Sequence, residues 1–187
     1  MTPRSSSRLR RVTTSAAFAL AIAFPSSALA DANGGIEPAY STGATVSILS
    51  TSFDNKLMAT VELEITCDPF PLIDPYTGEP TGPTTQPGRI YGEILLMQAQ
   101  GRSIAHAAGI LRAGDSGGMY QGLPVTCDGV TAQQFVVAVI AQDLPLKRGA
   151  AVMGVVVRMS ATETPPCCSG WFGSNAASTG PVSVKLR

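Results

Sequence analysis

Histidine, aromatic residues and charged residues are all scarce in this chain. One histidine occurs in 187 residues, 6% of the residues are aromatic and 14% are charged. A single histidine makes His-dependent catalysis or a histidine metal site hard to build. No stretch after residue 30 reaches the roughly 18 uninterrupted apolar residues that a membrane-spanning helix requires. We therefore expect no catalytic residues, no metal site, no cofactor and no membrane span in the mature chain.

Basic residues do not outnumber acidic residues over most of the chain. The first 30 residues contain four of the 13 basic residues and no acid, which leaves residues 31–187 with nine basic and 13 acidic residues, a net charge of about −4. A protein that binds nucleic acid needs a basic face, so we expect no nucleic-acid partner. The 44% hydrophobic content is sufficient for one domain with its own core and excludes a disordered chain.

The N-terminus has the three parts of a secretory signal peptide. Arg8–Arg11 is the basic region, Ala16–Phe24 is an apolar run of nine residues, and the sequence Ala-Leu-Ala ends at Ala30. The residues after Arg10-Arg11 match a twin-arginine signal poorly, which favours the general secretory route. We expect cleavage before Asp31 and a secreted, extracellular protein. The expected organisation is a signal peptide (1–30), an N-terminal extension (31–43) and one folded domain (44–187).

The mature chain alternates with a period of two residues. From Lys56 to Cys67 every odd residue is apolar, and Ala44–Ile48 and Val182–Arg187 alternate in the same way. Such alternation predicts strands with one dry and one solvated face. Two weaker candidates are 104–111 and 123–127, the second limited by Pro124 to an edge or a strand start.

Three further runs are apolar on both faces and predict central strands that are more fully buried: Ile90–Ala99, Phe135–Ala141 and Ala150–Met159. Helical periodicity is absent after residue 30. Seven or eight short strands separated by Gly, Pro and Asp turns predict an all-β fold, a single β-sandwich.

Two connections are too long for ordinary hairpins. Residues 68–88 contain six prolines and three glycines, and residues 161–180 contain two adjacent cysteines and two adjacent aromatic residues. Loops of this length inside a compact domain are usually functional or disordered.

Four cysteines in an exported chain predict disulfides. Thr66-Cys67-Asp68 and Thr126-Cys127-Asp128 are near copies, and each closes a strand, so we pair Cys67 with Cys127. This pairing leaves Cys167 and Cys168, which would form a vicinal bridge serving as a redox switch, a rigid binding turn or a shortened loop bridge. Crossed bridges from the first two cysteines to the adjacent pair remain an alternative.

Residues 114–118 spell G-D-S-G-G, the sequence around the nucleophile of chymotrypsin-like proteases. The order along the chain does not fit, because His106 and Ser116 are ten residues apart beside one hairpin, and the aspartate between them is Asp115 itself. Gly, Asp and Ser are also the residues that a tight turn requires. We interpret the motif as a turn and expect Ser116→Ala to leave folding unchanged.

Carboxylates gather at two places without forming a familiar site. Glu62 and Glu64 share the outer face of one predicted strand, about 7 Å apart, which suits a solvated face better than a glycosidase pair. Asp68, Asp74 and Glu79 lack the spacing of a calcium loop.

The best candidates for binding are aromatic residues on loops. Trp171 and Phe172 lie between two glycines beside the adjacent cysteines, and Tyr76 lies in the Pro-rich connection. Exposed aromatic side chains are unfavourable without a partner, although Trp171 could instead fold back over the end of the domain.

The order of these features resembles that of small secreted actinobacterial proteins of unknown function. The shared features are a strand ending in Thr-Cys, a second Thr-Cys followed by Asp-Gly, a Val-rich strand, a Leu-Pro…Gly-Ala strand start, a loop with cysteine and a short last strand. Here they are Ile65–Cys67, Val125–Gly129, Phe135–Ile140, Leu146–Ala150, Cys167-Cys168 and Val182–Leu186. The adjacent cysteines and the Pro-rich connection depart from the pattern. The resemblance implies an immunoglobulin-like or neocarzinostatin-like sandwich without a known activity.

Three functions are compatible with the sequence. The first is a non-enzymatic binding or surface-interaction module, with a protein or a small apolar ligand as partner. The second is a small-ligand carrier similar to the apoproteins of enediyne antibiotics, which would need an apolar cleft. The third, a serine hydrolase or thiol redox protein, would depend on Ser116 with His106 or on the adjacent cysteines.

Overall fold

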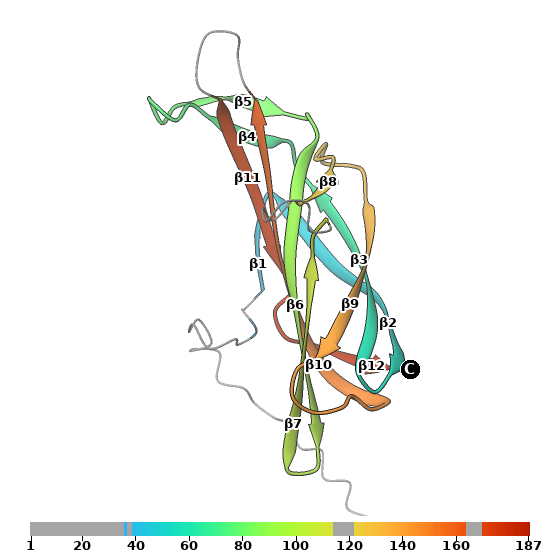
Figure 1. Cartoon of the computed structure of the whole chain (residues 1–187). Coiled ribbons are helices and arrows are strands. Elements are labelled where there is room, and N and C mark those ends of the chain that lie inside the picture. Colours follow the sequence, from blue (N-terminus) through green and yellow to red (C-terminus); the bar gives the residue numbers. More distant parts are fainter. Residues whose placement is uncertain (1–35, 37–38, 114–121, 164–169) are drawn as a thin grey trace, which may run out of the picture.

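The computed structural model describes residues 36, 39–113, 122–163 and 170–187. These residues form twelve β-strands that belong to one antiparallel sheet (Figure 1). The strands are β1 (Tyr40–Thr42), β2 (Ala44–Asn55), β3 (Met58–Cys67), β4 (Phe70–Ile73), β5 (Pro80–Thr84), β6 (Gly88–Gln100), β7 (Ser103–Leu111), β8 (Leu123–Val125), β9 (Gln133–Ala141), β10 (Gly149–Glu163), β11 (Trp171–Ser178) and β12 (Val182–Leu186). The described residues contain no helix that is long and apolar enough to cross a membrane.

The sheet curls into a half-barrel, and the predicted sandwich of seven or eight strands is wrong. Its order is β2-β3-β9-β7-β6-β10-β11-β4-β5, while β1 pairs with β11, β12 with β10 and β8 with β6. All of these pairings connect the twelve strands into one sheet, so among the described residues there is no second sheet to form a sandwich. The alternation of residues indicates which face of a strand is dry, but not which strand lies beside it.

β10 is the central strand of the half-barrel. It is 15 residues long and pairs with β6 along one edge and with β12 and then β11 along the other. The far edge of the sheet curls back toward β12, where the Phe53 amide of β2 donates to the Arg187 carbonyl at 2.8 Å. The curled sheet therefore encloses its own core.

The inner face of the sheet carries this core. The predicted alternation is confirmed in β3, where every odd residue from Ala59 to Cys67 is buried, whereas Leu57 lies exposed in the preceding turn. Buried side chains of β6 and β10 on the same inner face are Ile90, Ile94, Leu96, Met153, Val155, Val157 and Met159. They fill the concave side of the half-barrel.

Both ends of the half-barrel are plugged by a side chain from a connecting segment. At one end Phe70 of β4 is buried against Gly88 and Gly173, where a Cβ atom on either glycine would meet it. At the other end the β9–β10 connection inserts Leu146, whose amide donates to the Lys56 carbonyl at 2.7 Å. The interior is thus closed by the chain itself.

The Pro-rich connection is partly ordered as a hairpin, which differs from the expected loop. β4 and β5 pair with each other, and β4 also pairs with β11 through Ile73 and Phe172. β5 is an edge strand of the sheet. No strand lies on its open side, so Pro80 and Pro83, which lack an N–H group, do not interrupt hydrogen bonding there. The prolines thus blunt an edge strand rather than prevent a strand.

The second long connection is also shorter than expected. β10 continues to Glu163 and β11 begins at Trp171, so these two strands pair through a connection of seven residues. The cysteine pair 167–168 falls in this connection, outside the described residues.

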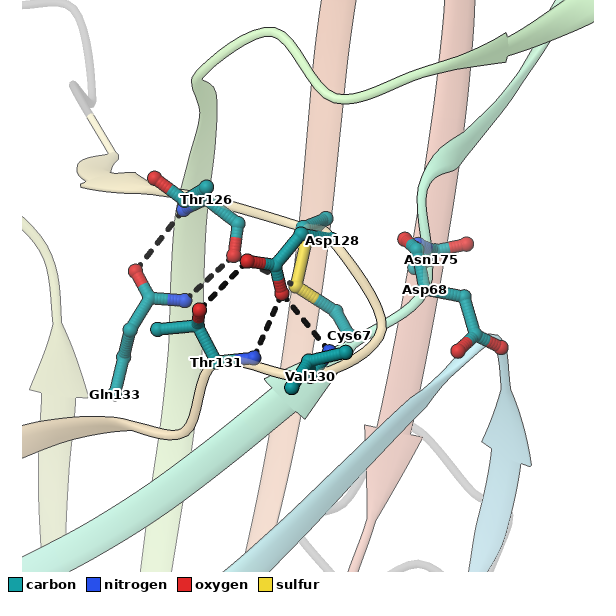
Figure 2. Close-up of a disulfide and its surroundings, with 9 residues drawn as sticks. Cys67, Asp68, Thr126, Asp128, Val130, Thr131, Gln133 and Asn175 are labelled. Atoms are coloured by element: carbon teal, nitrogen blue, oxygen red, sulfur yellow. Dashed lines mark hydrogen bonds between the residues drawn. A yellow bond between two sulfur atoms is a disulfide. The ribbon is translucent and has the colours of Figure 1, made fainter.

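The predicted disulfide between Cys67 and Cys127 is confirmed. It joins the end of β3 to the segment after β8, with 4.7 Å between the Cα atoms (Figure 2). The Gly129 amide donates to the Cys67 carbonyl at 2.8 Å, and its φ of 80° is one that glycine adopts readily. Asp128 closes the turn by accepting hydrogen bonds from the amides of Val130 and Thr131 and from the Thr131 hydroxyl.

Candidate functional site

The β4–β5 hairpin forms one end of the molecule, opposite the β6–β7 hairpin (Figure 1). Its turn is organised by Asp74, whose carboxylate accepts the Tyr76 amide at 2.8 Å and whose carbonyl accepts the Gly78 amide at 2.8 Å. Gly78 has a φ of 72°, which a side chain would disfavour. This turn presents Tyr76 to solvent, with 75% of its surface exposed.

Phe172 lies beside this hairpin. It is opposite Ile73 in the β11–β4 pair, and both side chains are on the outer face, with 50% and 38% of their surfaces exposed. We call Ile73, Tyr76 and Phe172 the aromatic end. Asp74 and Glu79 flank it, and residues 68–87 contain no Lys or Arg, so its charge is negative.

Trp171 does not belong to this surface. Successive residues of a strand point to opposite faces, so Trp171 points to the inner side of β11 when Phe172 points outward. Trp171 is half-buried, as expected of a side chain that covers the end of the core. The structure therefore separates two neighbouring aromatic residues that the sequence suggested as one site.

A second exposed apolar surface lies on the outer face of the half-barrel. Of the strands that were expected to be buried on both faces, β6 and β9 carry exposed or half-buried apolar side chains on the outside, whereas the outer face of β10 is covered at Gly154 by Ile36. Apolar residues on the outside of β3, β6, β7 and β9 form a strip, which we call the outer strip. It consists of Met58, Leu95, Met97, Ile104, Ala108, Ile110, Val136, Ala138 and Ile140.

The outer strip is continuous across four strands. Leu95 of β6 is opposite Ala108 of β7, Ala108 is opposite Ile140 of β9, and Ile140 is opposite Met58 of β3. Between 52% and 69% of the surface of Ile104, Ile110, Val136 and Ile140 is exposed. Contiguous exposed apolar area of this kind marks an interaction surface more often than scattered single residues do.

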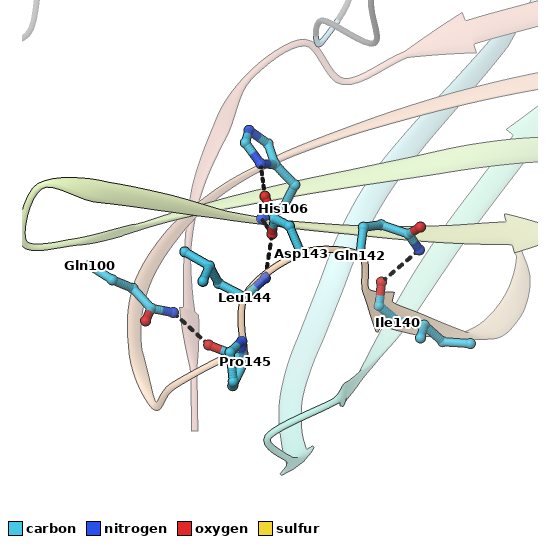
Figure 3. A network of polar contacts seen from close by, with 7 residues as sticks. All are labelled: Gln100, His106, Ile140, Gln142, Asp143, Leu144 and Pro145. Carbon is cyan, nitrogen blue, oxygen red and sulfur yellow. Dashed lines mark hydrogen bonds and ion pairs between the residues drawn. The ribbon is translucent and has the colours of Figure 1, made fainter.

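His106 interrupts the outer strip and is held by an aspartate. Its Nδ1 atom lies 2.6 Å from Asp143 Oδ2, and its backbone amide donates to Asp143 Oδ1 at 2.8 Å (Figure 3). The side-chain hydrogen bond with His106, together with the amides of His106 and Leu144, lowers the pKa of Asp143 from 3.8 to about 2. These contacts fix the β9–β10 connection to β7.

The histidine and aspartate pair resembles two thirds of a catalytic triad. The residues beside His106 on its own face are Ile104, Ala108 and Met97, and none of these can act as a nucleophile. Ser116 lies outside the described residues, so its interpretation as part of a turn stays a prediction. Within the described part of the chain, the pair ties the β9–β10 connection to β7.

A shallow hollow of about 390 Å³ lies beside β1 and the end of β3. Asn175, which is buried, donates to the Asp68 carbonyl at 2.7 Å and forms its floor. The hollow is lined by Thr42, Gly43, Asp68, Pro69, Pro71, Ser174 and Asn175. This lining is mixed and open to solvent, unlike the apolar cleft that a carrier of hydrophobic ligands needs.

Sequence reasoning named Tyr76 and Phe172, which the structure leaves exposed, but it missed three features. Ile73 was placed in a loop, the outer faces of β6 and β9 were expected to be buried, and the contact of Asp143 with His106 joins residues that are 37 positions apart in the sequence. A signal for the outer strip was present, because runs that are apolar on both faces need either two covering layers or a partner.

No protein-family model, curated protein or solved structure matches this chain.

Proposed function

We propose that this chain is a secreted, non-enzymatic binding module that engages a partner through its aromatic end. The observation that carries the proposal is the cross-strand pair of Phe172 and Ile73, which exposes two large apolar side chains beside Tyr76. Aromatic side chains are enriched among the residues that dominate binding energy at interfaces. The hairpin beneath them is fixed by the Asp74 turn, so little conformational freedom would be lost on binding.

The chemistry of the aromatic end indicates the kind of partner. Its apolar side chains are bordered by Asp74 and Glu79, without a basic residue on the hairpin. A partner with an apolar pocket edged by Lys or Arg would complement this surface. A protein fits that description better than a small apolar ligand does.

A carrier function is supported less well. The inner face of the half-barrel is filled by buried side chains, and Phe70 and Leu146 close its ends. Because a carrier needs a cavity that encloses its ligand, the packed interior favours a surface binder.

Photo-crosslinking tests the proposal. A photoreactive phenylalanine analogue at position 172 should form a saturable adduct with a surface protein of the producing organism, and the same analogue at the half-exposed Val182 should not. Excess unlabelled protein should abolish the adduct, whereas an excess of the Phe172→Ser/Ile73→Ser variant should not. Equal labelling from positions 172 and 182 would contradict the proposal.

Trp171 provides an independent readout. It is the only tryptophan of the chain and neighbours Phe172 in β11, so its fluorescence should change when the crosslinked partner is titrated in. A saturable signal with the neutral dye Nile red, lost in Phe172→Ser, would instead favour a small apolar ligand.

A further inference from the structure

We propose that the end of the half-barrel that Leu146 closes binds peripherally to a bilayer containing anionic lipids. This end, which we call the basic end, comprises the β2–β3 turn, the β6–β7 turn, the β9–β10 connection and the end of β12. It lies in the lower part of Figure 1, away from the aromatic end. The proposal does not depend on the function proposed for the aromatic end.

Antiparallel pairing gathers the basic residues at this end. Residues 31–187 contain nine basic residues, of which five are exposed at the basic end and three lie elsewhere. The five are Lys56, Arg102, Lys147, Arg148 and Lys185. The ninth, Arg187, also lies here, but the carboxylate of this last residue offsets its charge. The low basic content of the chain therefore hides a concentrated positive surface.

Two acidic residues share the basic end without pairing with these cations. Asp54 accepts the hydroxyls of Ser52 at 3.1 Å and Thr60 at 2.6 Å, and Asp143 Oδ2 lies 2.6 Å from His106 Nδ1. The ion pair found among the described residues is His106–Asp143, so within that part of the chain none of the five basic side chains is neutralised by an ion pair. Five cations against two carboxylates leave the basic end with a charge of about +3.

The other acidic side chains that the structure describes lie away from this end. Glu62 of β3 is five residues from Leu57, about 17 Å along the strand, and Glu93 of β6 is seven residues from Gln100, about 23 Å. Both distances exceed the Debye length of about 8 Å at physiological ionic strength. Farther still are Glu64, Asp68, Asp74, Glu79 and Asp128. An anionic surface therefore attracts the basic end while repulsion from these carboxylates is screened, although residues 31–187 carry a net negative charge.

Three apolar side chains are exposed among these charges. They are Leu57, Ile104 and Leu144, with 63%, 52% and 37% of their surfaces exposed. They belong to the β2–β3 turn, the start of β7 and the β9–β10 connection, and a cation lies within three residues of each along the chain. Exposed apolar side chains surrounded by Lys and Arg fit a bilayer interface, where the apolar groups enter the acyl boundary and the cations meet lipid phosphates.

Other occupants fit this end less well. A soluble polyanion would pair with the cations but would leave the three apolar side chains in water. A protein would need a rigid surface that matches three apolar side chains on three separate segments. Lipid headgroups rearrange around each of them, so a bilayer satisfies the charges and the apolar side chains together.

Hydrogen bonds hold the segments of the basic end together. The Leu146 amide donates to the Lys56 carbonyl at 2.7 Å, which joins the β9–β10 connection to the β2–β3 turn. The buried side chain of Gln98 in β6 accepts the Lys147 amide at 2.9 Å and donates to the Lys147 carbonyl at 2.6 Å. The basic end therefore meets a surface as one preformed unit, and little conformational freedom is lost on binding.

Vesicle co-sedimentation tests the charge dependence. The secreted protein should bind phosphatidylcholine vesicles that contain about 30 mol% phosphatidylglycerol, at least about tenfold more tightly than vesicles without it, and NaCl at about 0.5 M should release it. Lys56→Gln/Lys147→Gln should weaken binding by about 25-fold, because each cation near the headgroups contributes about fivefold. Arg89→Gln/Arg158→Gln removes the same charge away from the basic end and is the matched control, which should bind as the wild type does. Circular dichroism checks that both double variants fold.

Tryptophan fluorescence tests insertion of the apolar side chains. Trp171 is the only tryptophan of the chain and begins β11 at the opposite end, so lipids brominated on their acyl chains should not quench it when the protein binds. In the Trp171→Phe background, Leu57→Trp should be quenched by these lipids. Val130→Trp, at an exposed valine in the turn after the disulfide, is the matched control and should not be quenched.

Four results would each overturn the proposal. They are a wild-type protein that does not bind the anionic vesicles, equal binding to vesicles of phosphatidylcholine alone, equal losses in the two double variants, and a Leu57→Trp signal that brominated lipids leave unchanged. Retention on heparin without binding to anionic vesicles would assign the basic end to a soluble polyanion instead. None of these results bears on the crosslinking from position 172, which tests the aromatic end separately.

Discussion

Asp128 closes the turn after the disulfide, and its pKa gives that turn a pH dependence. The hydrogen bond from the Thr131 hydroxyl, followed by those from the amides of Thr131 and Val130, lowers the pKa from 3.8 to about 2. A carboxyl group with a lower pKa in the folded state stabilises fully above its unfolded pKa, and this contribution is lost as the pH falls from about 4 to about 2.

The Asp128→Asn variant isolates this contribution. An amide cannot titrate, so the free energy of unfolding of the variant should depend less steeply on pH between about 5 and 2 than that of the wild type. Urea titrations at several pH values measure the difference. Asp143→Asn, in the separate β9–β10 connection, should reduce the slope independently, because the pKa of Asp143 is also about 2. Parallel curves for Asp128→Asn and the wild type would contradict the prediction.

Gly154 leaves a notch in the outer face of β10 that Ile36 fills. A Cβ atom on Gly154 would overlap the Cγ2 atom of Ile36, which is buried there. We expect Gly154→Ala to lower the free energy of unfolding by about 1–3 kcal/mol, as overpacking does. In the background of Ile36→Ala the same change should cost less, because the Cγ2 atom is gone and only the Cβ atom of residue 36, at 3.0 Å, remains in contact. A thermodynamic cycle from chemical denaturation measures the coupling, and equal effects in both backgrounds would exclude the contact.

Elements that alternate cleanly were predictable, whereas those fixed by pairing were not. β3 and β12 follow from the alternation of small apolar and polar residues. β4 and β5 were missed because four prolines across Phe70–Thr84 match a loop, and an edge position that tolerates them cannot be recognised without the neighbouring strand.

The disulfide connects two elements that are far apart in the sequence. Cys67 and Cys127 enclose a loop of 60 residues, so replacing both by Ala should lower the free energy of unfolding by about 2–5 kcal/mol. Replacing Cys167 and Cys168 by Ser is the matched control. If those two pair with each other, the loop they close is negligible, and the expected effect is much smaller. Equilibrium unfolding measures both variants. Peptide mapping under non-reducing conditions that joins Cys67 to Cys167 would contradict this assignment.

At the scale of the whole molecule, the all-β class was predictable but the architecture was not. Because outer residues such as Val136 and Ile140 are apolar, the run Phe135–Ala141 was expected to be buried on both faces, which favoured a sandwich. The register that joins β3 to β9 and β6 to β10 depends on contacts between residues that are many tens of positions apart. The candidate surfaces could not be predicted for the same reason, because Phe172 lies opposite Ile73 only through the pairing of β11 with β4.

The central position of β10 determines the order in which the chain can fold. Hairpins such as β2–β3 and β6–β7 join neighbouring segments and can form within microseconds. β10 must wait until residues 149–163 have been synthesised, and its second edge must wait for β11 and β12. Until then β6 presents a long unpaired edge, which a neighbouring chain could occupy. Non-local pairing of this kind gives folding times of milliseconds to seconds, so the emerging chain is vulnerable to aggregation and to chaperone capture until its last strands arrive.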